Sequence, residues 1–219
     1  MKVTEEVIKV EGIKVRAMLE RFDSDDLKKL RSIFKTWQVL QKKQAVYGRK
    51  SNIPEVVTEG IVACFLGCPI LGKFPDGSGL KQVNYTKAQL ALRSKNRKAG
   101  RKNKDRPTLP SSSFDCYDLD DQKTVQVKSA SVDPDLTSFG PRSKFQKLYF
   151  LDFSSKGKVD GKFVIYDMPV ARVKSILKKI KKKNPDVRPR FSFQEKILKG
   201  KENKKKYRKG PKRDLFKSV

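Results

Sequence analysis

The stretch that most constrains the fold of this chain runs from Ser113 to Ser131 and reads SFDCYDLDDQKTVQVKSAS. Apolar and polar residues alternate in its two arms, 113–119 and 124–130, and Asp120-Asp121 lies between them. A period of two is typical of β-strands, and a short polar turn between two such arms indicates a β-hairpin. The fold must therefore contain a sheet that this hairpin can join.

The same stretch is acidic within a strongly basic protein. The 219 residues include 52 Lys and Arg against 24 Asp and Glu, a formal net charge of +28, whereas residues 115–135 hold six Asp and two Lys. A basic balance of this size indicates a polyanionic partner, most often nucleic acid. Carboxylates repel a polyanion unless they bind a cation. We therefore expect these carboxylates to hold a divalent cation while surrounding Lys and Arg bind phosphates.

The chain contains no histidine. This absence excludes Ser-His-Asp and Cys-His catalysis, nucleases with His-bound metals, and zinc fingers built on Cys and His. Any chemistry must use carboxylates, Lys, Tyr or a metal ion.

The cysteines and the apolar runs indicate the compartment. Cys64, Cys68 and Cys116 are odd in number and lie in apolar surroundings, so we expect buried free thiols and no zinc site. No apolar run approaches the roughly 20 residues of a membrane-spanning helix, and the opening residues have no signal-peptide pattern. We therefore expect a cytoplasmic protein without a membrane partner.

The first third of the chain predicts helices. Residues 24–26 are typical of a helix start, and apolar side chains follow at helical spacing, so a helix is predicted over about 25–47. Its apolar stripe packs either on the core or on a second subunit. After a basic loop, a second helix is predicted over about 53–66, with Glu55 and Glu59 four residues apart on one face.

Later segments predict more strands and a further helix. Strands are expected over 147–153 and 163–167, a helix over about 169–183, and a short strand over 188–193. The lysine-rich residues 199–212 predict a tail that stays mobile until it meets phosphate.

A basic segment precedes the hairpin. Residues 81–106 contain ten basic residues and one acidic residue, which predicts either a basic helix and loop that contact nucleic acid or a solvated surface. Together the segments indicate an α/β fold with a central mixed β-sheet flanked by helices. We expect an N-terminal helical part (1–50) that contacts DNA or a second subunit, a core (51–198) and a basic tail (199–219).

The two arms of the hairpin place a carboxylate, an amide and an amine together. Gln126 and Lys128 are two residues apart and share a face, and Asp115 lies on the adjacent arm. Asp115 and the Gln126 carbonyl would bind Mg²⁺ with water in the remaining positions, and Lys128 would orient the attacking water or neutralise transition-state charge. Asp118 is the competitor of Asp115, but on a regular strand it points to the opposite face.

The chain also resembles a known family. SFDCYD, QVKSASVDPDLTSFGPRSKFQKLYFLDF, FVIYDMP and RPRFSF look like the small type II restriction endonucleases with a PD-(D/E)XK nuclease core. The family they resemble most cuts GC-rich interrupted palindromes such as GCNGC. The likeness includes NIPEVVTEG and covers most of residues 50–195, and SFGPRSKFQKLYFLDF is its specific part.

The resemblance assigns roles to the hairpin residues. The family's metal-binding Asp falls on Asp115, its second acidic position on Gln126 and its Lys on Lys128. Gln126 departs from the pattern, and because a neutral amide binds Mg²⁺ more weakly than a carboxylate, another acid would compensate. The resemblance indicates Glu55 or Glu59 for that role.

The resemblance also implies the substrate and the partners. We expect a Mg²⁺-dependent, sequence-specific endonuclease for double-stranded DNA, active as a homodimer on a palindrome, with a cognate DNA methyltransferase. Base reading would use Arg or Lys on guanine, or amides on adenine. The loop residues expected near the site, which read bases or bind phosphates, are Arg49, Lys50, Asn52, Arg142 and Lys144.

Two other functions fit parts of the sequence. A non-catalytic RNA- or DNA-binding protein would suit the charge, and a structure-selective repair or recombination nuclease would keep the same core. A pure binding protein gains nothing from acids that face its polyanion, whereas a metal-dependent nuclease requires some. The acidic hairpin therefore favours the nuclease.

Overall fold

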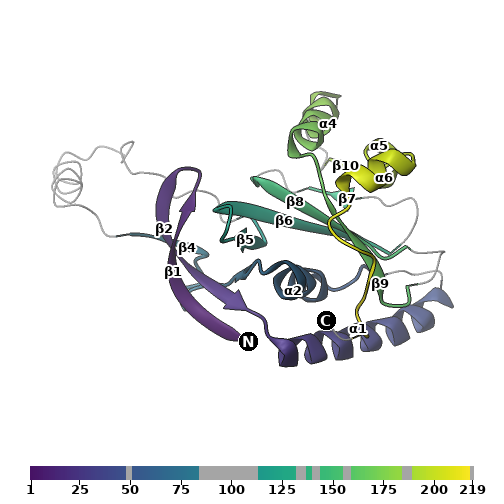
Figure 1. Ribbon diagram of the computed structural model, residues 1–219, viewed down its shortest axis with the longest axis horizontal. Coiled ribbons are helices and arrows are strands. Elements are labelled where there is room, and N and C mark those ends of the chain that lie inside the picture. The colour runs from purple at the N-terminus through teal and green to yellow at the C-terminus, as the bar shows by residue number, and fades with distance from the viewer. Residues whose placement is uncertain are drawn as a thin grey trace.

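The structure is a computed structural model that describes residues 1–47, 51–83, 113–131, 137–139, 144–154, 159–183 and 189–217 (Figure 1). Its helices are α1 (Ser24–Ala45), α2 (Glu55–Leu66), α4 (Val170–Lys183), α5 (Phe193–Lys196) and α6 (Lys201–Tyr207). Its strands are β1 (Lys2–Val10), β2 (Ile13–Arg21), β3 (Ile70–Leu71), β4 (Leu80–Gln82), β5 (Cys116–Asp118), β6 (Lys123–Ala130), β7 (Thr137–Ser138), β8 (Lys147–Asp152), β9 (Lys162–Asp167), β10 (Arg190–Phe191) and β11 (Arg213–Asp214).

A mixed sheet forms the centre of the fold. Its strands follow the order β1-β2-β3-β5-β6-β8-β9-β11, and β4 also pairs with β2. The pair β6–β8 is parallel, while the other pairs of this sheet are antiparallel. The predicted hairpin is present as β5 and β6, with Cys116 opposite Val125. The predicted α/β fold with a mixed central sheet is thus confirmed.

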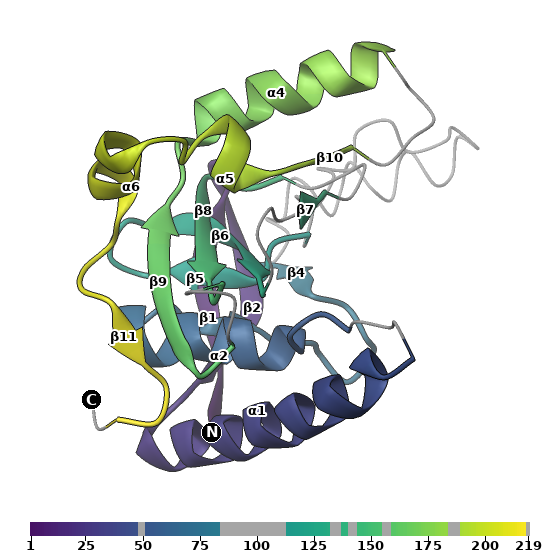
Figure 2. The same cartoon turned by 90° about the vertical axis from the view of Figure 1, so that its right-hand side faces the viewer.

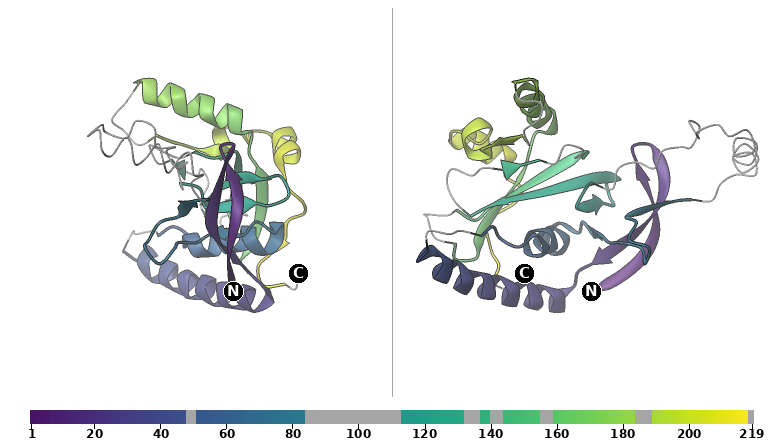
Figure 3. Two further views of the ribbon diagram at one scale, coloured as in Figure 1. Left: turned by 90° about the vertical axis from the view of Figure 1, so that its left-hand side faces the viewer. Right: turned by 180° about the vertical axis from the view of Figure 1, so that it is seen from behind.

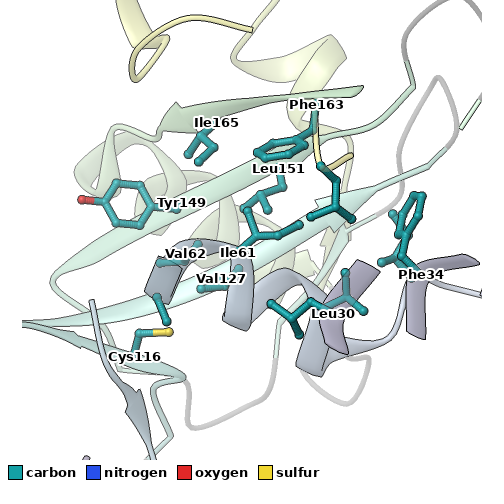
Figure 4. Packing of buried hydrophobic residues seen from close by; sticks show 14 of the residues in the cluster. Leu30, Phe34, Ile61, Val62, Cys116, Val127, Tyr149, Leu151, Phe163 and Ile165 are labelled. Carbon is teal, nitrogen blue, oxygen red and sulfur yellow. The ribbon is translucent and has the colours of Figure 1, made fainter. Parts of the chain in front are cut away.

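Helices cover the two faces of this sheet. In Figure 2, α1 and α2 lie on one side of the strands and α4, α5 and α6 on the other. Strand β8 shows why, because its side chains alternate between two cores: Tyr149 and Leu151 pack with α1 and α2, and Leu148 and Phe150 pack with α4 and α5. Figure 4 shows the first of these cores between the two N-terminal helices and the strands.

Helix α1 begins with a capping box between Asp23 and Asp26, and its buried stripe includes Leu30 and Phe34. The predicted stripe therefore packs on the core. Helix α2 approaches α1 closely at Gly60, where a Cβ atom would lie 2.6 Å from Leu30 Cδ1. This close contact fixes the position of α2, which carries both predicted glutamates.

The first 21 residues form a β-hairpin that the sequence analysis did not predict. Strands β1 and β2 pair over nine residues and stand at one end of the sheet (Figure 3). Of the described residues 1–47, those that are helical are Ser24–Ala45. The missed signal is the alternation of Val15, Ala17 and Leu19, all of which are buried, with half-buried Arg16 and Met18.

The lysine-rich end of the chain is also more ordered than predicted. After α6, strand β11 pairs with β9, and Leu215 is fully buried in the core beneath α1. Arg31 on α1 donates hydrogen bonds to the carbonyl oxygens of Leu215 (2.6 Å) and Lys217 (2.7 Å). The prediction of a mobile tail over 199–212 was wrong because the apolar residues that follow the lysine run anchor it to the core.

We expect Leu215→Ala to destabilise the protein by about 2 to 4 kcal/mol, because it leaves a cavity in a fully buried site. Urea unfolding would measure this loss, with Lys204→Ala on the exposed side of α6 as the control. Equal stabilities of the two variants would show that the C-terminal segment contributes nothing to the core.

The other predicted elements agree with the structure where it describes them. Strands β8 and β9 and helix α4 lie within two residues of their predicted bounds, and the last predicted strand is β10. Of the basic segment, residues 81–83 are described and end strand β4, whereas residues 84–106 lie outside the described residues.

Candidate active site

Asp115 is held against β6 just before β5 begins. Its backbone N donates to Val125 O (2.9 Å), and its backbone O accepts from Leu71 N (2.9 Å). One side-chain oxygen, Oδ2, accepts from the backbone N of Val127 (2.7 Å) and from Gln126 Nε2. The carboxylate thus takes the place of a neighbouring strand along this part of β6, which fixes its position.

Gln126 presents an oxygen atom without a hydrogen-bond partner. The side chain is 4% exposed, and its Nε2 is used by Asp115. Its Oε1 is buried and accepts no hydrogen bond from the described residues. A buried carbonyl oxygen without a partner costs free energy, so this atom beside a carboxylate suits a hard cation or an ordered water.

Lys128 lies two residues further along β6 and is half-buried. Its Nζ is 5.9 Å from the centroid of the Phe139 ring, and within the described residues it forms no ion pair. Its positive charge lowers the pKa of both Asp115 and Glu59. The amine is therefore near both carboxyl groups but is not neutralised by either.

The two glutamates of α2 are electrostatic neighbours of this group. Burial, together with the charges of Asp115 and Glu55, raises the pKa of Glu59 to about 8. Burial also raises the pKa of Asp115, although the hydrogen bond from Val127 N lowers it in part. Of the five predicted residues, Asp115, Gln126 and Lys128 are thus neighbours on the β5–β6 hairpin, whereas Glu55 and Glu59 are linked to them by the effect of their charges, and Glu55 is exposed.

Asp118 has a different environment. Its carboxylate forms an ion pair with Lys147 and accepts a hydrogen bond from the backbone N of Asp121 (3.0 Å). Asp121 pairs with the same lysine. Asp118 and Asp121 thus form a structural ion-pair cluster with Lys147 at the hairpin turn. Asp115 lies apart from this cluster, and its charge raises the pKa of Glu59.

The residues match what a Mg²⁺ site uses. Within the described ranges no group of three or more His, Cys, Asp or Glu is arranged to hold a metal by itself. Mg²⁺ keeps several waters and needs only one or two carboxylates, so Asp115 with the unpaired Gln126 Oε1 fits it.

The comparison with protein-family models decides the family. The model described as Bsp6I restriction endonuclease matches residues 22–200. The chain belongs to the Bsp6I restriction endonuclease family. Neither the search of curated proteins nor the search of solved structures found a match.

Membership in the Bsp6I restriction endonuclease family makes this chain a site-specific nuclease that acts on DNA. It therefore favours the nuclease over a non-catalytic binding protein. The described part of the chain has no helix with the length and apolar character needed to cross a membrane.

The predicted DNA contacts of this restriction endonuclease are described only in part. Asn52 is exposed just before α2. Lys144 is exposed and lies 3.3 Å from a carboxylate oxygen of Glu11 on the β1–β2 turn. Arg49, Lys50 and Arg142 lie outside the described residues.

The three cysteines of the restriction endonuclease are free thiols, as predicted. Cys68 and Cys116 are buried, and Cys64 is partly exposed. Burial raises the pKa of Cys64 to about 11 and that of Cys68 to about 12. The thiols are therefore protonated near neutral pH and are unsuited to nucleophilic chemistry.

Sequence reasoning missed one acidic neighbour of this site. The charge of Glu20, on β2, contributes to the raised pKa of Glu59. No local pattern signals this relation, because it depends on how β2 is joined to β5 through β3.

Proposed function

We propose that this member of the Bsp6I restriction endonuclease family is a Mg²⁺-dependent type II enzyme that cuts both strands of DNA at a short GC-containing palindrome such as GCNGC. The catalytic residues are Asp115, Gln126 and Lys128 on a PD-(D/E)XK core, assisted by Glu55 or Glu59. The observation that carries this proposal is the Asp115–Gln126 contact, which leaves a buried amide oxygen unpaired beside a carboxylate and near Lys128.

The residues have separate roles in this proposal. Asp115 and Gln126 Oε1 would hold the Mg²⁺, and Glu59 or Glu55 would supply the further negative charge. A cation held there would supply Lewis-acid chemistry toward the scissile phosphodiester. Lys128 orients the attacking water and offsets the charge that develops on the phosphoryl oxygens.

The proposed enzyme acts as a homodimer in the cytoplasm. Two copies on a palindrome place one site on each strand, because the two-fold symmetry of the protein then matches that of the DNA. Arg49, Lys50, Asn52, Arg142 and Lys144 are the proposed base or phosphate contacts. A cognate methyltransferase that modifies the same sequence is the proposed partner that protects the host DNA.

Incubation of the purified protein with unmethylated plasmid DNA tests the metal dependence. We expect double-strand cuts with Mg²⁺ and none with EDTA. Lys128→Ala should lower the cleavage rate by about 10²- to 10³-fold, because it removes the charge that stabilises the transition state.

The matched control is Lys123→Ala, which removes an exposed lysine at the start of the same strand. DNA binding by Lys128→Ala, measured by gel shift, should stay close to that of the control. Equal cleavage rates for the two variants would contradict the role of Lys128, and cutting that persists in EDTA would contradict the metal dependence.

A further inference from the structure

A pocket of about 450 Å³ lies where the C-terminal segment passes the end of α2. Its lining comes from α2, β9 and the residues in and around β11. Figure 2 shows β11 at the edge of the sheet, beside α2. The charged lining residues are four basic ones, Lys162, Lys212, Arg213 and Lys217, and one acidic one, Asp214. This excess of positive charge favours an anionic ligand.

Arg213 is held in this pocket by groups that carry no net charge. Its guanidinium lies over the ring of Phe65, with Cζ 4.9 Å from the ring centroid. Its Nη1 donates a hydrogen bond to the backbone O of Phe65 (3.4 Å). The backbone of Arg213 is fixed as well, because the residue is paired with Phe163 on β9. The side chain is therefore positioned before any ligand binds.

The charge of Arg213 has no counterion within the described residues. The residue is half-buried, and its Nε atom is buried and donates no hydrogen bond to any of them. Burial lowers the pKa of the guanidinium, because it disfavours the charged form. A buried charge with an unpaired donor costs free energy, and an anion that accepts a hydrogen bond from Nε would remove this cost.

Two acids beside the pocket have other partners. Asp160 forms an ion pair with Lys162 (2.9 Å). Asp214 lies opposite Lys162 in the pairing of β11 with β9, and its Oδ1 accepts a hydrogen bond from the backbone N two residues further on (3.0 Å). These acids therefore offset the charge of Lys162. Arg213 and the exposed Lys217 form no ion pair in the part of the chain that the structure describes, so their charges are available to a ligand.

We propose that this pocket binds a phosphate group of the DNA backbone, with Arg213 as the central contact and Lys217 beside it. The inference rests on membership in a family that acts on DNA, and it does not depend on the proposed metal site. Arg presents a planar fork of N–H donors that matches phosphate oxygens, and Lys adds a point charge. Strand β11 lies three strand spacings from β6, about 14 Å across the sheet, so this phosphate is not the scissile one. Arg213 therefore positions the DNA and takes no part in the chemical step.

Binding of the full-length protein to a DNA duplex of arbitrary sequence tests this contact. Fluorescence anisotropy in EDTA, at several salt concentrations, gives the affinity without cleavage. We expect Arg213→Gln to weaken binding at low salt and to make the slope of log affinity against log salt shallower by about 0.9, the contribution of one neutralised phosphate. Arg213→Lys keeps the charge but lacks the fork, so it should keep the slope and bind with an affinity between those of the wild type and Arg213→Gln.

The control is Arg16→Gln, which makes the same chemical change at a strand residue whose charge is already paired with Glu5. Its slope should equal that of the wild type. Urea unfolding would show that the variants are folded, and if Arg213→Gln is not, Lys217→Gln at the exposed neighbour carries the test with the same expected change of slope.

A wild-type slope in the folded pocket variant would overturn the phosphate contact, whether or not the wild type cuts DNA. An equal change of slope in Arg16→Gln would also overturn it, because the loss of any one charge would then suffice. A third arm compares thermal unfolding in inorganic phosphate and in chloride at equal ionic strength. Stabilisation by phosphate that Arg213→Gln abolishes, together with an unchanged DNA slope, would overturn the assignment to DNA and indicate a free phosphate compound instead.

Discussion

Replacing Asp115 by asparagine is expected to lower the DNA cleavage rate by at least about 10³-fold while the protein stays folded. Asparagine keeps an oxygen that accepts the hydrogen bond from Val127 N, so the link between Asp115 and β6 survives. The substitution removes the carboxylate that accepts a hydrogen bond from Gln126 Nε2. Single-turnover cleavage at saturating Mg²⁺ is the measurement.

The matched control for this variant is Asp120→Asn, which makes the same chemical change at an exposed position of the same acidic stretch. It should cut DNA at the wild-type rate. Asp118→Asn completes the set, because Asp118 is the competing metal ligand and is engaged by Lys147. Loss of cleavage in Asp118→Asn with near-normal cleavage in Asp115→Asn would reverse the assignment of the two aspartates.

Replacing Glu59 by glutamine is expected to remove a large pH dependence of stability in the metal-free protein. The pKa of Glu59 is about 8 in the folded state against the ordinary 4.5, because of burial and its acidic neighbours. Between these values the folded protein holds a proton that the unfolded chain releases, so stability falls as pH rises. From pH 6 to pH 9 this group costs the wild type about 2 to 3 kcal/mol.

Urea unfolding in EDTA at pH 6 and pH 9 measures this effect. Between pH 6 and pH 9, the unfolding free energy of Glu59→Gln should increase by that amount relative to the wild type. Glu202→Gln should follow the wild type, since its carboxyl is exposed. Parallel pH profiles for the wild type and Glu59→Gln would show that Glu59 titrates normally and does not face Asp115.

The elements that were predicted correctly have local signals. The β5–β6 hairpin, β8, β9, α1, α2 and α4 each show a regular apolar period over their own length. The β1–β2 hairpin also alternates, but charged residues at its intervening positions obscured the pattern. The anchoring of the C-terminus by Leu215 was hidden by the lysines that precede it, because net charge says nothing about a single buried side chain.

The site was predictable only where its residues are close in sequence or are matched by a resemblance. Gln126 and Lys128 share a face because they are two residues apart on one strand. The pairing of Asp118 with Lys147 joins residues 29 positions apart, and the effect of the Glu20 charge on Glu59 depends on how β2 joins the sheet through β3. Such contacts are set by strand order, which a single sequence does not display.

Sequencing the ends of the fragments produced from unmethylated phage DNA tests the proposed function most directly. We predict that fragments appear only with Mg²⁺ and that all ends derive from one short GC-containing palindrome, cut at the same position in both strands. Ends without a common sequence would contradict site-specific cleavage, and DNA that is bound but never cut would contradict the nuclease itself.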